Sequence, residues 1–155
     1  MAQYTGVQRG VAGTASSTQL NNGTLTVLTA GMLAKVKAIA WGGSDTSLIS
    51  YCTRWARVTN TPATPTALTI QNSNPNTTAL ASYNTYSTTP TTTASPAGLF
   101  QQDWNSQGGG GVVTLPIGGE WFVTGGALGQ LYNQIGCGNV VGASANTSFC
   151  TTWEE

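Results

Sequence analysis

The sequence predicts an all-β protein, an antiparallel β-sandwich of jelly-roll type. Short runs of alternating or β-branched residues recur along the 155 residues, and clusters of Gly, Pro and Asn separate them. No long helical pattern competes with these runs. Many short strands divided by turn residues are typical of sandwiches and jelly rolls. The length fits one domain, 1–155, in which residues 1–23 are expected to form an extended arm.

The N-terminal part contains this arm and two predicted strands. Residues 1–23 are rich in Gly, Ser, Thr and Gln, and their apolar residues are scattered. A first strand is expected at 24–28. Residues 33–41 alternate, and although Ala, Leu and Lys favour a helix there, the β-branched Val36 and Ile39 favour a strand. The face of this strand opposite the two lysines carries Ala34, Val36, Ala38 and Ala40.

The next segment, residues 47–58, also alternates, and either of its faces could be buried. One face carries Ile49, Tyr51, Thr53, Trp55 and Arg57, and the other carries Leu48, Ser50, Cys52, Arg54, Ala56 and Val58. A short strand at 67–71 and an Asx turn at 72–76 are expected to follow. Residues 85–96 are dominated by Thr, Ser and Pro. They are too few to separate domains and are expected to wrap a surface.

Glycines punctuate the C-terminal part. The four residues Gly108–Gly111 give the backbone freedom to turn sharply or to lie close against another chain. Residues 112–115 and 120–124 are joined by Pro116-Ile117-Gly118-Gly119. This arrangement predicts a β-hairpin with a Gly-bearing loop.

Two segments complete the chain. Residues 127–135 fit either a strand or a short helix. Residues 148–153 alternate again, which favours a strand. Because this strand carries Phe149 and Trp153, we expect it to be held within a sheet.

Charged residues make up only 6% of the chain, five Lys plus Arg and five Asp plus Glu, and there is no His. Ordinary domains carry about 25% charged residues. Acid–base catalysis, activated nucleophiles and hard-metal sites need such side chains gathered together, and here they are scattered. The sequence therefore predicts no enzyme and no catalytic, cofactor-binding or metal-binding residue. The formal net charge of zero argues against nucleic acid as a partner, because phosphate binding needs clustered Lys and Arg.

Membrane and redox context follow from the apolar runs and the cysteines. No apolar run approaches the roughly 20 residues of a membrane span, and the first six residues lack the features of a secretion signal. We therefore expect synthesis in a cytoplasm and no membrane partner. The three cysteines, Cys52, Cys137 and Cys150, lack metal-ligand spacing. Buried free thiols are the simplest interpretation, and a Cys137–Cys150 disulfide is the alternative under oxidising conditions.

Several polar residues have the chemistry for a site, and each has a structural alternative. Asp45 could help bind Ca²⁺, but without a second carboxylate nearby a turn-stabilising role is expected. Asp103, Trp104 and Asn105 are residue types with which sugar-binding modules hold hydroxyls and stack on a ring. Trp104 is nevertheless expected in the core or in a subunit contact. Asp103 and Glu120 could form the carboxylate pair of a glycosidase. The chain has only five acidic residues from which such a pair could come, so we do not favour this interpretation.

Arg54 and Arg57 flank Trp55 on a predicted strand. If these arginines point into a sandwich, they need a carboxylate partner, and Asp103 and Glu120 are the available ones. The alternative is a place at a subunit seam, since Arg and Trp are enriched at interface hot spots. Three sequons, at Asn22, Asn76 and Asn146, match a glycosylation acceptor. Because the chain is rich in Asn and Thr, three such matches are expected by chance.

The Thr- and Gly-rich strands, the Leu115-Pro116-Ile117-Gly118-Gly119-Glu120-Trp121 segment and the Trp153-Glu154-Glu155 ending resemble small virion proteins of tailed bacteriophages. The nearest class is the capsid cement or decoration proteins. The resemblance covers most of the chain in composition, contains no diagnostic motif and carries over no functional residue. It implies a β-sandwich or jelly-roll subunit, often a homotrimer, that sits over the joints between major capsid protein subunits and holds the shell.

From this resemblance we predict a structural protein on the capsid exterior of a virion, which associates with itself and with the major capsid protein. The zero net charge agrees, since it favours association. The arm and residues 85–96 are expected to reach neighbouring subunits. The alternative is a carbohydrate- or receptor-binding module of a phage fibre or tail, centred on Asp103 and Trp104. A hydrolase is a third interpretation, which the residue inventory does not support.

Overall fold

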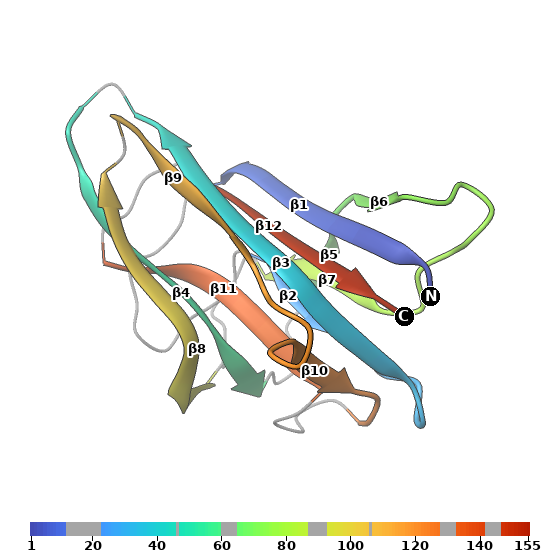
Figure 1. Ribbon diagram of the computed structural model, residues 1–155. Helices are drawn as coiled ribbons and strands as arrows, with labels where there is room; N and C mark the ends of the chain where they lie inside the picture. The colour runs from blue at the N-terminus through green and yellow to red at the C-terminus, as the bar shows by residue number, and fades with distance from the viewer. Residues whose placement is uncertain are drawn as a thin grey trace.

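Two antiparallel sheets pack face to face in the computed structural model, so the predicted β-sandwich is confirmed (Figure 1). The structure describes residues 1–11, 23–45, 47–59, 65–86, 93–105, 107–127, 133–141 and 147–155. These ranges contain twelve strands.

Sheet A has the order β10-β3-β12-β1-β6, and β9 pairs with the same side of β3 as β10. Its strands are β1 (Gln3–Val11), β3 (Leu33–Ser44), β6 (Ile70–Asn72), β9 (Gln107–Thr114), β10 (Trp121–Thr124) and β12 (Thr147–Glu154). Sheet B has the order β5-β7-β2-β11-β4-β8. Its strands are β2 (Thr24–Thr26), β4 (Ser50–Thr59), β5 (Pro65–Ala67), β7 (Ser82–Tyr86), β8 (Thr93–Asn105) and β11 (Gln134–Val141).

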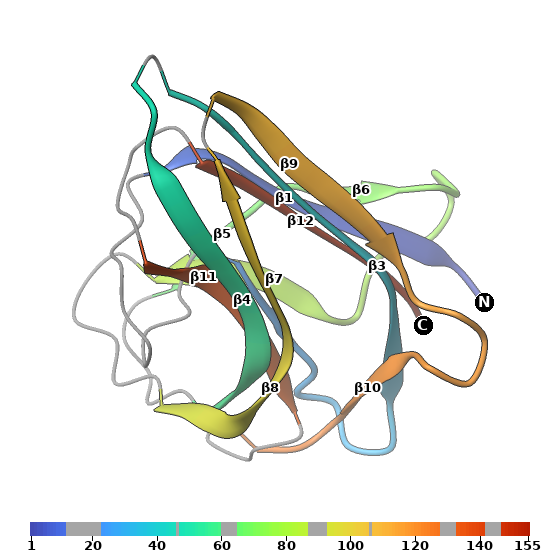
Figure 2. The same cartoon turned by 60° about the vertical axis from the view of Figure 1, so that its left-hand side comes forward.

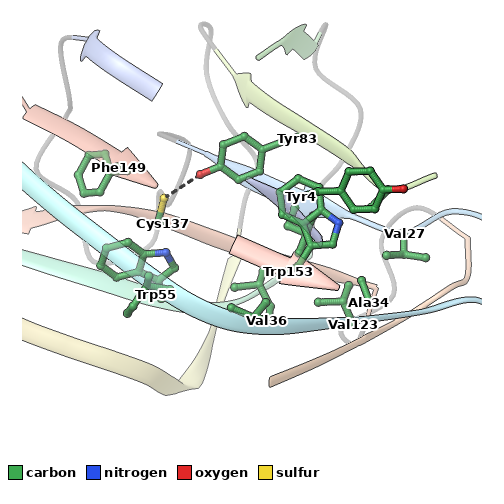
Figure 3. Close-up of a cluster of buried hydrophobic side chains, with 14 of the residues drawn as sticks. Tyr4, Val27, Ala34, Val36, Trp55, Tyr83, Val123, Cys137, Phe149 and Trp153 are labelled. Atoms are coloured by element: carbon green, nitrogen blue, oxygen red, sulfur yellow. Dashed lines mark hydrogen bonds between the residues drawn. The ribbon is translucent and has the colours of Figure 1, made fainter. Parts of the chain in front are cut away.

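The core lies between the sheets and is rich in aromatic rings (Figure 3). Along β12 every second side chain is buried, which confirms that Phe149 and Trp153 hold this strand in a sheet. The Trp153 ring stacks between Tyr4 of sheet A and Tyr83 of sheet B, with centroids 5.9 Å from each. Phe149 meets Trp55 of sheet B edge to face, with centroids 5.8 Å apart. Offset and edge-to-face pairs of this kind add to the burial of apolar area.

Polar groups inside the core bind one another across the two sheets. The Thr151 hydroxyl accepts a hydrogen bond from Trp55 Nε1 and shares another with Tyr83 Oη, both at 3.3 Å. Tyr83 Oη also lies 3.9 Å from Cys137 Sγ (Figure 3), and Sγ donates to the carbonyl of Gly23 at 3.3 Å. Burial raises the pKa of both Tyr83 and Cys137, so both groups stay protonated and uncharged.

The prediction of an extended arm is wrong for residues 3–11. They form β1, which pairs with β12 on one side and with β6 on the other. The segment reads as irregular because its inward positions include a glycine, Gly6, where the Tyr83 ring from sheet B occupies the space of a side chain. The rest of the predicted arm, residues 12–22, lies outside the described residues.

The strand predicted at 33–41 is confirmed as β3, but its faces are not those expected. Lys37 is an extra residue opposite β12, since Val36 pairs with Trp153 and Ala38 with Thr152. This β-bulge reverses the alternation, so the buried positions change from even-numbered to odd-numbered residues. Those positions are Ala34, Val36, Ile39 and Trp41. Ala38 and Ala40 consequently lie on the outer side of the sheet.

The hairpin predicted at 112–124 is wrong. β9 and β10 do not pair with each other, and both pair with the same side of β3, where they follow one another in a single direction. The connecting loop projects from this edge through a turn in which Gly119 N donates to Pro116 O at 2.8 Å and Gly118 has a φ of 87°. The twelve-residue β3 offers enough partners for both strands, so no reversal is needed.

Three further segments are strands only in part, and the strand alternative for 127–135 holds for Gln134 and Ile135. Residues 67–71 are interrupted after Ala67, with β5 in sheet B and β6 in sheet A, so the chain crosses between the sheets there. Residues 85–96 belong at both ends to β7 and β8, and residues 87–92 lie outside the described residues. Of residues 127–135, Gln134 and Ile135 begin strand β11, while 128–132 lie outside.

The segment 47–58 buries residues of both faces. Tyr51, Thr53 and Trp55 are buried on one face, as alternation predicts, and Trp55 belongs to the main core. Beyond Trp55 the pairing with β8 shifts register twice. Ala56 and Val58 form a separate buried cluster there. The predicted Asx turn is confirmed, since Asn76 N donates to Asn74 Oδ1 at 3.0 Å.

Candidate docking surface

The side of sheet A that faces away from sheet B carries Lys35, Lys37 and Glu154 at one end and small, mostly uncharged side chains over the rest. We call this second part the outer face. It is formed by alternate residues of β1, β12, β3 and β9, namely Thr5, Val7, Arg9, Ser148, Cys150, Thr152, Ala38, Ala40, Gly42, Gly110, Val112 and Thr114. None of the described strands of sheet B covers it, and each of these residues keeps some exposure to solvent.

The outer face is hollowed at its centre. One hollow of about 440 Å³ is bordered by Val7, Ala40, Val112 and Cys150 together with neighbouring glycines. A second, of about 340 Å³, adjoins it across β1 and is bordered by Thr69 and Gln71. Both hollows are lined by Val7 and Arg9. Among the described residues that line the two hollows, Arg9 is the one charged side chain.

The glycine run forms one wall of the first hollow. Sequence reasoning allowed Gly108–Gly111 either to turn sharply or to lie against another chain. In the structure they lie in β9 against β3 of the same chain. A Cβ on Gly111 would come within 2.7 Å of Cζ2 of Trp41, so only glycine admits the indole at this place.

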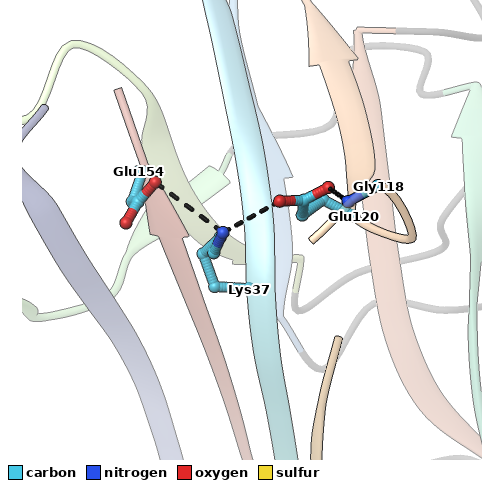
Figure 4. Close-up of polar contacts among 4 residues, drawn as sticks. All are labelled: Lys37, Gly118, Glu120 and Glu154. Carbon is cyan, nitrogen blue, oxygen red and sulfur yellow. Dashed lines mark hydrogen bonds and ion pairs between the residues drawn. The ribbon is translucent and has the colours of Figure 1, made fainter. Parts of the chain in front are cut away.

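A charged cluster lies where β3, β12 and the β9–β10 loop meet (Figure 4). Lys37 Nζ lies 2.9 Å from Glu120 Oε1 and 3.9 Å from Glu154 Oε2. Gly118 N donates to the other oxygen of Glu120 at 2.7 Å. Bonded by Lys37 and by backbone amides, Glu120 has its pKa lowered to about 2, while the bond to Glu120 raises the pKa of Lys37. The cluster neutralises much of its own charge.

The proposed pairing of Glu120 with Asp103 as two catalytic carboxylates is not supported by their positions. Glu120 binds Lys37 at the β10 side of sheet A, whereas Asp103 lies in β8 of sheet B, opposite Cys52. Among the described residues, no group of three or more His, Cys, Asp or Glu is arranged to hold a metal ion.

Trp104 takes the structural role expected for it. Its Nε1 donates to Thr53 Oγ1 at 2.7 Å, and its ring stacks on Tyr51 with centroids 4.9 Å apart. Thr53 in turn donates to Asn139 Oδ1 at 2.9 Å. Trp104 keeps part of its surface exposed beside a hollow of about 410 Å³, which Asp103 and residues of β4 also line.

The other predicted polar residues lie on β4 or in the loop before it. Asp45 accepts a hydrogen bond from Tyr51 Oη at 2.7 Å, which joins the loop after β3 to the start of β4. Arg54 and Arg57 are half-buried, and the guanidinium of Arg54 lies over Gly98. Their place at a subunit seam stays a prediction.

All three cysteines are free thiols. Cys137 and Cys52 are buried, and Cys150 is half-buried on the outer face. Burial, together with the neighbouring Asp103 carboxylate, raises the pKa of Cys52 to about 11. Burial also raises the pKa of Cys150. None of the three is therefore an activated nucleophile near neutral pH.

Of the three sequons, Asn76 lies in an exposed turn, and Asn22 and Asn146 lie outside the described residues. In the part of the chain that the structure describes, no helix has the length and apolar character needed to cross a membrane.

The outer face was not identified from the sequence. Its members are Ala, Gly, Thr, Ser and Val, which occur throughout the chain and carry no signal individually. The usable signal was the alternation of small with large residues in 148–153, where Cys150 and Thr152 separate the buried Phe149, Thr151 and Trp153.

Comparisons with known proteins add no relative to these observations. A scan against protein-family models, a search of curated proteins and a search of solved structures each found no match.

Proposed function

We propose that this chain is a non-enzymatic structural protein of a phage virion, which decorates the capsid exterior by associating with itself and docking on the major capsid protein. The outer face of sheet A is the docking surface in this proposal. The resemblance to cement proteins implies a homotrimer. A measurement of the protein's mass in solution tests this part of the prediction.

The order of the strands supports the jelly-roll part of the proposal. Eight strands, taken in chain order, are β1, β2, β3, β4, β8, β9, β11 and β12. β1 pairs with β12, β2 with β11, β3 with β9 and β4 with β8. The first of the eight strands thus pairs with the last, and so on inward to the two in the middle. β12 also pairs with β3, and β11 with β4. A long hairpin rolled into two sheets has these pairings, and jelly rolls recur in viral capsid and lectin domains.

The observation that carries the proposal is the outer face itself. It extends over four strands, is hollowed in the middle, and has Arg9 as the single charged residue lining its hollows. Small neutral side chains let a partner approach the backbone closely, and they avoid the desolvation cost of burying ions. Fold alone does not imply function, so the surface must be tested directly.

The test places a charge at the centre of this face. Val7 lines both hollows and points away from the core, so Val7→Glu should leave the fold intact and abolish binding to a capsid. Capsids assembled from the major capsid protein of the same genome are mixed with the purified protein and sedimented. Leu80→Glu is the matched control, because Leu80 is 64% exposed in the loop before β7. Binding of the wild type and the control, but not of Val7→Glu, supports the proposal.

A wild-type protein that never sediments with the capsids would refute the docking role. The second candidate is the carbohydrate- or receptor-binding module, which the hollow beside the half-exposed Trp104 favours. Aromatic faces stack on sugar rings, and Asp103 and Asn105 border the same hollow. Binding on a glycan array that disappears in Trp104→Ala would favour this candidate.

A further inference from the structure

β9 forms an outer edge of sheet A. β3 lies on one side of it, and within the described ranges no strand pairs with its other side (Figure 2). Leu115 N donates to Lys37 O at 2.7 Å, so Leu115 and Lys37 form a hydrogen-bonded pair of this antiparallel ladder. Hydrogen-bonded pairs alternate with non-hydrogen-bonded pairs along the two strands. The backbone groups of Gly111 and Val113 therefore point toward β3, and those of Val112 and its alternate neighbours point away from it.

The other edges among the described strands are protected against the addition of another strand. β5 and β6 have three residues each, and β10 has four. β8 is long, but its pairing with β4 shifts register twice and it carries Asp103. Short edges, bulges and edge charges are the means by which proteins avoid strand pairing. β9 has eight residues without a charge or a proline, and its pairing is regular from Gly110 to Thr114.

We propose that β9 is a self-association edge, on which β9 of a second copy of this chain pairs antiparallel about a two-fold axis at Val112. In this register Val112 lies opposite its own copy, and Gly110 lies opposite Thr114. The outward N–H and C=O groups of these residues would exchange about six hydrogen bonds, two for each directly opposed pair. The two copies of sheet A become one continuous sheet.

The chemistry of the strand favours a second copy as the occupant. β9 carries no charge, so two copies meet without like-charge repulsion. Val112 is 73% exposed in the single chain, and the pairing brings it against the same side chain of the partner. A two-fold contact uses the same patch on both copies and therefore closes, instead of growing into a filament.

This inference rests on the self-association in the proposed function and changes its expected form. Two-fold pairing of β9 produces a dimer, or an assembly built from dimers, where the resemblance implies a trimer. Docking of the outer face on a capsid is a separate contact, which Val7→Glu tests independently.

Amide hydrogen exchange in the wild-type protein provides the first test. In a single chain the amides of Val112 and Thr114 face solvent and exchange fast, while those of Val113 and Leu115 are held by β3. With β9 paired, the first two amides become protected as the protein concentration rises and the mass doubles by light scattering. The amides of Val113 and Leu115 are the internal control, since they are protected at every concentration.

A variant provides the second test. Val112→Lys places a charge beside its own copy on the two-fold axis and should shift the dimer to the monomer mass at the same concentration. Leu80→Lys, at a comparably exposed leucine remote from β9 in sequence, should leave the mass unchanged.

Three outcomes would overturn the inference. A protein that stays monomeric at every concentration excludes the second copy, and a trimer with fast exchange at Val112 and Thr114 places self-association elsewhere. Protection of these amides only after capsid is added shows that the occupant is a capsid protein strand. Val112 also borders the first hollow, so docking is judged from the wild type and Val7→Glu alone. Sedimentation of the wild type with capsids would retain the docking proposal in each case, so the two proposals can fail separately.

Discussion

The ring of Tyr83, from sheet B, lies directly against the backbone of Gly6 in sheet A. A methyl group at Gly6 would overlap the ring carbons of Tyr83. Tyr83 is itself fully enclosed and stacks on Trp153, so it cannot retreat without loss of that contact. Gly6 is therefore a position where the absence of a side chain makes room for a ring from the opposite sheet.

Substitution of this glycine is expected to destabilise the sandwich. Gly6→Ala should lower the free energy of unfolding by about 1–3 kcal/mol, the usual cost of overpacking a core. Gly42→Ala is the control, because the nearest atom to a methyl group there is a carbonyl oxygen 3.9 Å away on the outer face. Its effect should stay within about 0.5 kcal/mol. Urea unfolding of the two variants measures the difference, and equal effects would contradict the close contact at Gly6.

The buried hydroxyl of Thr151 is expected to matter more than that of its neighbour. Thr151→Val keeps the shape of the side chain but leaves Trp55 Nε1 without its acceptor in the core. An unsatisfied buried donor costs about 1–3 kcal/mol. Thr152→Val, one residue along on the outer face, loses a part-buried hydroxyl contact with Thr5 Oγ1 at 3.2 Å but leaves no fully buried donor, so it should cost less than Thr151→Val. Thermal unfolding measures both, and a neutral Thr151→Val would mean that the core network contributes little.

The Lys37–Glu120 pair is expected to make stability depend on pH. The pKa of Glu120 is about 2 in the folded chain against an ordinary value of 4.5. Its carboxylate therefore stabilises the fold above pH 4.5, and this contribution is lost as the pH falls from 4.5 to about 2. Glu120→Gln should lower the melting temperature at pH 6 and have no effect near pH 2.

Glu154→Gln is the matched control for this prediction, because Glu154 lies 3.9 Å from Lys37 and not 2.9 Å. It should lower the melting temperature at pH 6 by less than Glu120→Gln does. A difference between wild type and Glu120→Gln that stays constant from pH 6 to pH 2 would show that the carboxylate charge is not responsible.

The three thiols are expected to differ in their reaction with iodoacetamide at pH 8. Cys137 is inaccessible, and with a pKa of about 11 only about a thousandth of Cys52 is thiolate at this pH. Cys150, half-exposed on the outer face, should react first, and Cys150→Ser should remove this fast phase. Mass spectrometry should find three alkylated thiols in denaturant without reductant. Only one would reveal the alternative Cys137–Cys150 disulfide.

Local sequence patterns predicted which residues form strands better than they predicted which strands pair with each other. Residues 33–41 and 148–153 were predicted as strands and are strands, because alternation reports the two sides of an extended backbone. The supposed hairpin at 112–124 failed, because a Gly-bearing turn between two strands does not reveal that both can pair with a third. Pairing is set by residues distant in sequence.

The candidate site could be predicted only in its general character. The shortage of charge predicts a surface for contact, and the outer face, with Arg9 as its one charged member, and the uncharged β9 are where the proposals place that contact. Its location could not be predicted, because the bulge at Lys37 decides which residues of β3 face outward. Ala38 and Ala40 belong to the outer face only as a result of that one extra residue.

By itself the sequence determined the all-β class, the low content of charged residues and the strands that carry clear alternation. Those properties depend on composition and on a two-residue period, both of which are local. The tertiary structure alone decided that residues 3–11 are an inner strand, that Tyr83 fills the space beside Gly6, and that β9 lies at an edge. Each of these depends on which distant strand supplies the neighbouring hydrogen bonds and side chains, and no local pattern encodes that choice.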